Sequence, residues 1–176
     1  TKSDTIKLKW IENIIENCWD DEIWPLYNQY MYDFSEQKLK SNPGNVKFIK
    51  YKSAAINNFG YLAASNHNQV LALKYYNQSV ELAKSINSYD DLGTSYNNIG
   101  VVYSNVGDND MAFKYYKLGL ESHLKNNDNY EIQTLYSNLA SLRLKSGDTL
   151  GAKEYYDNSL EIRLKENNPH SLVEIY

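Results

Sequence analysis

The stretch YNNIGVVYSNVGDNDMAFKYYKLGLE, residues 96–121, returns 40 residues later as YSNLASLRLKSGDTLGAKEYYDNSLE, residues 136–161. A shift of 40 residues aligns the first Tyr, the central Gly-Asp and the Tyr-Tyr pair of the two stretches. A third copy lies one shift upstream and shares these residues with the first stretch: Asn57, Asn58, Gly60, Ala72, Lys74, Tyr75, Tyr76 and Glu81. Self-similarity at a fixed period is the signature of a repeat protein.

Each copy predicts two helices, which we call helix A and helix B. The apolar residues of helix A in the central copy follow the helical spacing i, i+3, i+4, i+7: Tyr96, Ile99, Gly100 and Tyr103. Gly107 suits the end of this helix, and Asp108 suits the N-cap of the next one. The apolar seam of helix B comprises Ala112, Tyr116, Gly119 and Leu120. Because one pair cannot bury its own apolar face, the pairs are expected to stack.

Small residues recur at two positions of the repeat. They are Gly60, Gly100 and Ala140 in helix A, and Ser79, Gly119 and Ser159 in helix B. Since Gly costs about 1 kcal/mol against Ala inside a helix, its recurrence indicates that the paired helices approach closely there. In each Tyr-Tyr pair, one ring is expected on the core seam and the other against the neighbouring repeat. Loop asparagines, such as those of NNDN at 126–129, are interpreted as ordinary surface composition.

This pattern resembles the tetratricopeptide repeat, and the resemblance covers roughly residues 49–176. The residues that match the family signature are Gly100, Gly107, Ala112, Tyr116 and Gly119, with their counterparts 40 residues on. The long period is similar to the longer-helix variety found in kinesin light chains and in many bacterial regulators. The resemblance implies an all-α fold, a right-handed superhelical solenoid of antiparallel helix pairs. Two departures are His67 at the inter-helix Gly and Arg143 at the aromatic position of Tyr103.

The predicted organisation follows from this period. The three repeats span 49–88, 89–128 and 129–168, and the start of a truncated further repeat spans 169–176. Residues 1–48 are more degenerate and predict a divergent N-terminal helical pair that caps the array. Its first helix is expected to include Ile6 through Trp19, and its second to run from Pro25 to Lys40. The chain starts at Thr1 without Met, so we expect a piece of a longer protein or a trimmed mature form.

Composition argues against several classes of partner. The formal net charge is −4 and the pI about 5.4, whereas binding of nucleic acid needs a basic surface. Apolar runs are only a few residues long, so no membrane-spanning segment is expected within this chain. The single cysteine, Cys18, allows no internal disulfide. We expect a cytoplasmic location, with the periplasmic portion of a membrane-bound sensor as the alternative.

No pattern in the sequence predicts catalysis, a cofactor or a metal. Phosphate-binding, nucleophile-elbow and zinc-ligand motifs are absent from the sequence. His67 is expected in a turn, His123 at an exposed helix position and His170 beside Pro169, none with a second metal ligand at suitable spacing. The acidic run at 20–22 is interpreted as a helix-capping, solvated turn. The chain is therefore not expected to be an enzyme.

One face of helix A carries an Asn at the same place in all three repeats. The resemblance implies that helix A lines the concave surface of the array, where related proteins use Asn at this position to hold peptides. The candidate peptide-binding residues on this face are Asn58, Asn98, Asn138, Tyr61, Val101, Asn105, Ser141 and Lys145. An Asn carboxamide both donates and accepts, so a row of them could bind the amides of an extended peptide. Alternatively, these asparagines bond to the next repeat's helix or are merely solvated.

The predicted function is a non-catalytic scaffold that binds a protein or peptide. The NNIG, GD and YY pattern resembles arrays that precede output modules of bacterial regulators, especially in Bacteroidetes, so the chain is expected to be the sensory or interaction segment of such a regulator. Its partner could then be an output domain of the same chain. The alternatives are a free-standing adaptor and the regulatory part of an enzyme whose catalytic domain lies elsewhere. A clamp for C-terminal carboxylates would need basic residues across several repeats, and only Lys145 qualifies.

Overall fold

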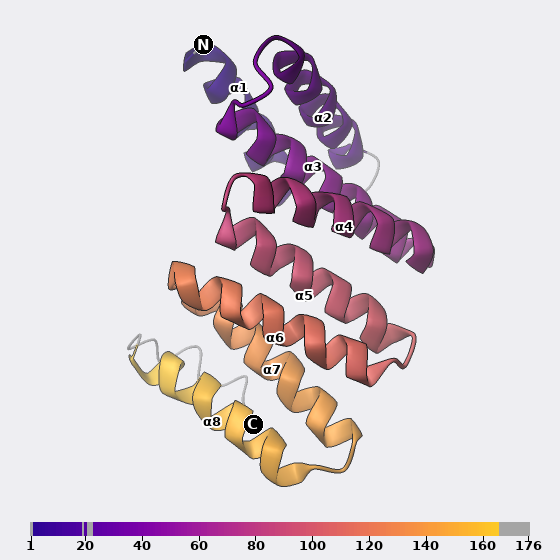
Figure 1. Cartoon of the computed structure of the whole chain (residues 1–176), viewed down its shortest axis with the longest axis vertical. Helices are drawn as coiled ribbons and strands as arrows, with labels where there is room; N and C mark the ends of the chain where they lie inside the picture. Colours follow the sequence, from indigo (N-terminus) through magenta and orange to yellow (C-terminus); the bar gives the residue numbers. More distant parts are fainter. Residues whose placement is uncertain (1, 19, 21–22, 166–176) are drawn as a thin grey trace. The chain divides into compact units, whose positions relative to one another are not determined.

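The computed structural model describes residues 2–18, 20 and 23–165, and Figure 1 shows the helices that these residues form. They are α1 (Lys2–Asn17), α2 (Trp24–Ser41), α3 (Val46–Ser65), α4 (Gln69–Ser85), α5 (Tyr89–Asn105), α6 (Asn109–Asn126), α7 (Asn129–Lys145) and α8 (Thr149–Lys165). No strand occurs in this described part of the chain. The prediction of an all-α array of antiparallel helix pairs is confirmed. The expected opening of a further repeat at 169–176, with His170, lies outside the described residues, as do Trp19, Asp21 and Glu22.

The chain divides into two compact units, Thr1–Asp91 and Leu92–Tyr176. In unit 1, α1 packs on α2, α2 on α3 and α3 on α4; in unit 2, α6 packs on α7 and α7 on α8. Pro25 occupies the first turn of α2, where its missing N–H costs no hydrogen bond. The boundaries proposed for the repeats stay predictions, and α3 begins three residues before the expected start of the first one.

A residue with positive φ ends five of these helices. The five are His67, Asn87, Gly107, Asn127 and Gly147, with φ between 53° and 83°. In each turn the next residue donates its backbone N–H to a carbonyl five residues earlier, as Asn68 does to Ala63 over 2.8 Å. This is the Schellman arrangement, which satisfies carbonyls that the helix end would otherwise leave open. His67 therefore takes the conformation that Gly107 takes in the next repeat.

The residue after each left-handed position starts the next helix. Oδ1 of Asn68, Asp108, Asp128 and Asp148 accepts a backbone N–H three residues on, at 2.9–3.2 Å. Ser88 occupies the same place and its hydroxyl donates to Asp91. The interpretation of the asparagines at 126–129 as ordinary surface composition misses a role of Asn127, which makes the turn before the cap residue Asp128.

Each unit has its own apolar core. In unit 1 the buried cluster comprises Leu8, Ile11, Met31, Phe48 and Ala55. In unit 2 it comprises Ala112, Tyr116, Leu120, Ile132, Leu135, Leu139 and Leu142. Both clusters join a helix B to the helix A that follows it, and so bury the faces that a single pair would leave exposed.

Glycine in helix A lets a tyrosine ring of helix B lie on the backbone. A Cβ built on Gly60 would come within 2.5 Å of Cε1 of Tyr76, and one on Gly100 within 2.5 Å of Cδ1 of Tyr116. Both rings are at most 4% exposed, and burial raises the pKa of both phenols.

The third repeat has Ala140 at this place, and its tyrosine differs. Tyr156 is 37% exposed, and the half-buried Tyr155 is the ring of this pair that packs against the core cluster of unit 2.

The other ring of each pair packs mainly within its own repeat. Tyr115 stacks on Tyr103 of α5 with the ring centroids 5.6 Å apart, and Tyr75 contacts Phe59 of α3 at 5.7 Å. Tyr155 alone shows the expected contact with the preceding repeat, at 6.4 Å from Phe113. Arg143 adds a guanidinium 4.6 Å from that same Phe113 ring, so this departure from the family pattern still covers an aromatic face.

His123 corrects another expectation, because it is fully buried rather than exposed. A Cβ on Gly93 would lie 2.3 Å from Nε2 of the imidazole, so the ring fills the space that Gly93 leaves empty. The equivalent pair in the last repeat is Gln133 and Arg163, whose side chains hydrogen-bond over 2.7 Å. The two positions thus vary together in size and polarity.

We predict that Gly100→Leu lowers the free energy of unfolding by about 1–3 kcal/mol, because the new side chain displaces the buried ring of Tyr116. Chemical denaturation measures this. Gly44→Leu is the control, since a Cβ there meets nothing within 4 Å. An unchanged midpoint for Gly100→Leu would contradict the close contact of ring and backbone.

We predict that His67→Gly raises the free energy of unfolding by about 0.5–1 kcal/mol, because a residue with a Cβ is strained at positive φ. The adjacent Asn66 has φ −84°, so Asn66→Gly should destabilise instead. Thermal melts of both variants test the pair. A loss of stability in His67→Gly would mean that the imidazole makes a contact worth more than the strain.

Candidate ligand-binding face

In unit 1 the recurring Asn of helix A, Asn58, takes part in a chain of hydrogen bonds. Nδ2 of Asn58 donates to Oδ1 of Asn28 in α2 over 2.9 Å. Nδ2 of the fully buried Asn28 then donates to the carbonyl oxygen of Ala55 over 3.0 Å. Asn58 itself is half-buried, so this chain runs from the core toward the surface of α3.

In unit 2 a similar bond joins two helices A. Nδ2 of Asn138 in α7 donates to Oδ1 of Asn97 in α5 over 2.9 Å. Asn98, the predicted member of the row, is half-buried on α5. Asn58 and Asn138 therefore bond to the preceding helix pair, whereas the alternative drawn from the sequence was a bond to the next repeat. One bond uses only part of a carboxamide, which has two N–H donors and an acceptor oxygen.

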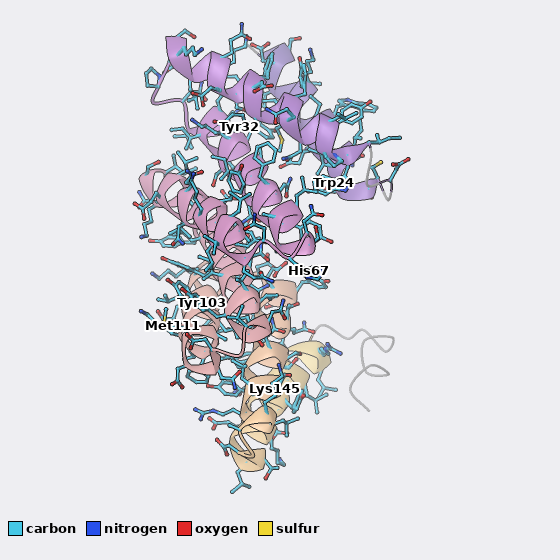
Figure 2. All side chains as sticks on the ribbon, turned by 90° about the vertical axis from the view of Figure 1, so that its right-hand side faces the viewer. Trp24, Tyr32, His67, Tyr103, Met111 and Lys145 are labelled. Carbon is cyan, nitrogen blue, oxygen red and sulfur yellow. The ribbon has the colours of Figure 1, made fainter. Side chains whose placement is uncertain are left out.

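The other candidate residues are all exposed: Tyr61, Val101, Asn105, Ser141 and Lys145. In unit 2, Nζ of Lys145, which is labelled in Figure 2, donates to Oγ of Ser104 over 3.3 Å. This bond again links α7 to α5 on the same face as the Asn97–Asn138 pair. Peptide binding by these residues stays a prediction. Because they are exposed, a peptide could reach them.

The Asn face of unit 1 borders a cleft of about 390 Å³. Its lining comes from α1, α2, α3 and the segment after α1: Glu12, Ile15, Glu16, Cys18, Trp24, Met31, Ala54, Asn58 and Tyr61. The rings of Trp24 and Tyr61 lie with their centroids 6.1 Å apart and tilted by 52°. Figure 2 shows Trp24 at the beginning of α2. Two of the predicted residues, Asn58 and Tyr61, thus belong to this cleft.

Glu12 is the half-buried acid of the cleft. Burial raises its pKa, and the neighbouring carboxylate of Glu16 raises it further. Asp91 acts in the same direction, whereas Lys50 and Lys9 lower the pKa. Glu12 and Glu16 could not be predicted as site residues from the sequence. They lie in α1, outside the clear repeats, and comparing the repeats with one another cannot detect a position that occurs once.

No helix in the described part of the chain is both long and apolar enough to cross a membrane.

Three known structures resemble the fold closely enough to compare. BtubC (BKLC) from P. vanneervenii is 18% identical with a TM-score of 0.62, and the match covers 95% of this chain and 76% of that one. The N-terminal domain of stress-induced protein-1 (STI-1) from C. elegans is 18% identical with a TM-score of 0.60, covering 72% and 94%. MamA is 12% identical with a TM-score of 0.56, covering 90% and 88%. At these identities the likeness shows the fold alone.

A comparison with curated proteins found no match. Two family models match, and both are described as tetratricopeptide repeat. One matches residues 52–125 and the other residues 134–166, so together they span more than half of the chain. The chain therefore belongs to the tetratricopeptide repeat family.

Proposed function

We propose that this chain is a protein-interaction scaffold that binds an extended peptide on the Asn-bearing faces of its helices A. The observation that carries the proposal is the pairing of carboxamides across helices, Asn58 with Asn28 and Asn138 with Asn97. Each pair stands beside exposed residues of the same face, among them Tyr61 and Ser141. Family membership supports the general role, since tetratricopeptide repeats typically bind protein partners.

The inter-helix bonds favour binding because they fix the carboxamides before a ligand arrives. A free Asn side chain loses rotamer freedom when it binds a peptide, and this loss reduces affinity. In Asn58 and Asn138 one N–H is already engaged, so the rotamer is set. The remaining donor and acceptor capacity can then pair with a peptide amide, whatever side chains the peptide has.

The setting of the scaffold is a further part of the proposal. We favour the interaction or sensory segment of a larger bacterial signalling regulator, in the cytoplasm or as the periplasmic part of a membrane-bound one. A free-standing adaptor and the regulatory part of an enzyme are the alternatives. The resemblance of the repeat pattern to regulator arrays is what supports the first.

We predict that the double variant Asn98→Ala, Asn138→Ala stays folded and loses its ligand, because it removes two carboxamides from the face. Unfolding midpoints check the fold, and an affinity pull-down from the source organism's lysate with mass spectrometry checks the ligand. The matched control is Asn77→Ala with Asn126→Ala, two exposed asparagines on helices B.

A partner held by the wild type and the control but lost by the double variant would place binding on the Asn face. Equal recovery by all three proteins would contradict the proposal, because the ligand would then bind elsewhere on the array.

A further inference from the structure

We propose that the cleft of unit 1 binds the side chain of a Lys or Arg in the peptide ligand, with Glu12 and Glu16 as acceptors and Trp24 and Tyr61 as aromatic walls. The inference rests on the proposed function, because it assigns one side-chain subsite to the same binding face. Asn58 connects the two, since it belongs both to the Asn face and to the cleft lining.

The charge of the cleft lining indicates which kind of peptide side chain the cleft would bind. Among the residues that the structure describes, the lining contains two carboxylates and no Lys, Arg or His. Lys50 and Lys9 act on Glu12 from outside the lining, but they offset its burial and the repulsion from Glu16 only in part, since the pKa of Glu12 stays raised. A cationic side chain would therefore be attracted by the two carboxylates, whereas an acidic one would be repelled.

The half-buried state of Glu12 strengthens this choice. Burial and Glu16 both raise its pKa, which means that the ionised carboxylate is disfavoured in the empty cleft. A bound ammonium or guanidinium group would stabilise the ionised form and relieve the repulsion between the two acids. Hydrogen bonds between ionised partners are also stronger than neutral ones.

The aromatic and aliphatic walls suit the rest of such a side chain. Ile15, Met31 and Ala54 offer apolar contact to the methylene stem of Lys or Arg, which buries readily beside a charged head. The rings of Trp24 and Tyr61 are the side-chain types that attract a cation over their faces. A volume of about 390 Å³ is large enough for a long side chain.

The geometry also suits an extended peptide. A backbone amide paired with Asn58 would leave the neighbouring side chain of the peptide at the mouth of the cleft, because Asn58 is itself part of the wall. The Asn would then bind the peptide regardless of sequence, and the cleft would select one residue of it.

The test uses a phage-displayed library of random linear peptides, selected on the full 176-residue chain and on the variant Glu12→Gln, Glu16→Gln. The matched control, Glu81→Gln with Glu154→Gln, removes two exposed acids outside the cleft. We expect the wild type and the control to enrich peptides with Lys or Arg at one position, and the cleft variant to lose that enrichment. Circular dichroism melts confirm that all three proteins are folded.

A second measurement locates the bound side chain. Replacing the enriched Lys by norleucine should weaken the dissociation constant about tenfold or more, since it removes a charge-assisted contact. Cys18, the single cysteine, lines the cleft, so bound peptide should slow its alkylation by iodoacetamide.

The outcomes separate the two proposals. Enriched peptides without a basic residue, or with equal affinity for the cleft variant, would overturn the cleft assignment and leave peptide binding standing. Failure of the wild type to enrich any peptide would overturn both.

Discussion

The array depends on a backbone constraint at the end of its helices. Five residues, twenty positions apart from His67 to Gly147, take positive φ, and in four of the five turns the next residue caps the following helix. Within each unit the turn reverses the chain within three residues, so the two helices that it joins run antiparallel. The Asn positions recur at equivalent places of helix A because the turns keep the spacing of the repeats.

The contacts between the two helices of a pair depend on the sizes of the side chains that meet where the helices cross. Where Gly60 or Gly100 stands opposite a tyrosine, the ring lies on bare backbone and is buried. The repeat with Ala140 at this place has Tyr156 37% exposed. Gly93 and His123 repeat the same rule at another crossing. Side-chain volume is therefore exchanged between partner positions while the backbone arrangement stays the same.

The sequence predicted the features that recur and missed those that depend on a partner. Helices, turns and small-residue crossings were readable because the same residue type stood at equivalent positions. His123 was misplaced because its burial depends on the missing side chain of Gly93, which periodicity does not reveal. Asn127 could not be assigned to the turn because Asn, although it takes positive φ more readily than most residues, is also common at ordinary surface positions. Asn28 could not be found either, since it lies 30 residues before Asn58 rather than 40.

The difference between recurring positions and positions that occur once also separates general peptide binding from selective binding. Residues that recur in every repeat can contact only what recurs in a ligand, and in an extended peptide that is the backbone amide. Selectivity needs a position that occurs once, and the divergent N-terminal pair supplies it with Glu12, Glu16 and Trp24. The departure of the N-terminal pair from the repeat pattern is therefore compatible with a specific function of that pair. This pair is where a repetitive surface can gain a residue-specific subsite without disturbing the turns that hold the rest.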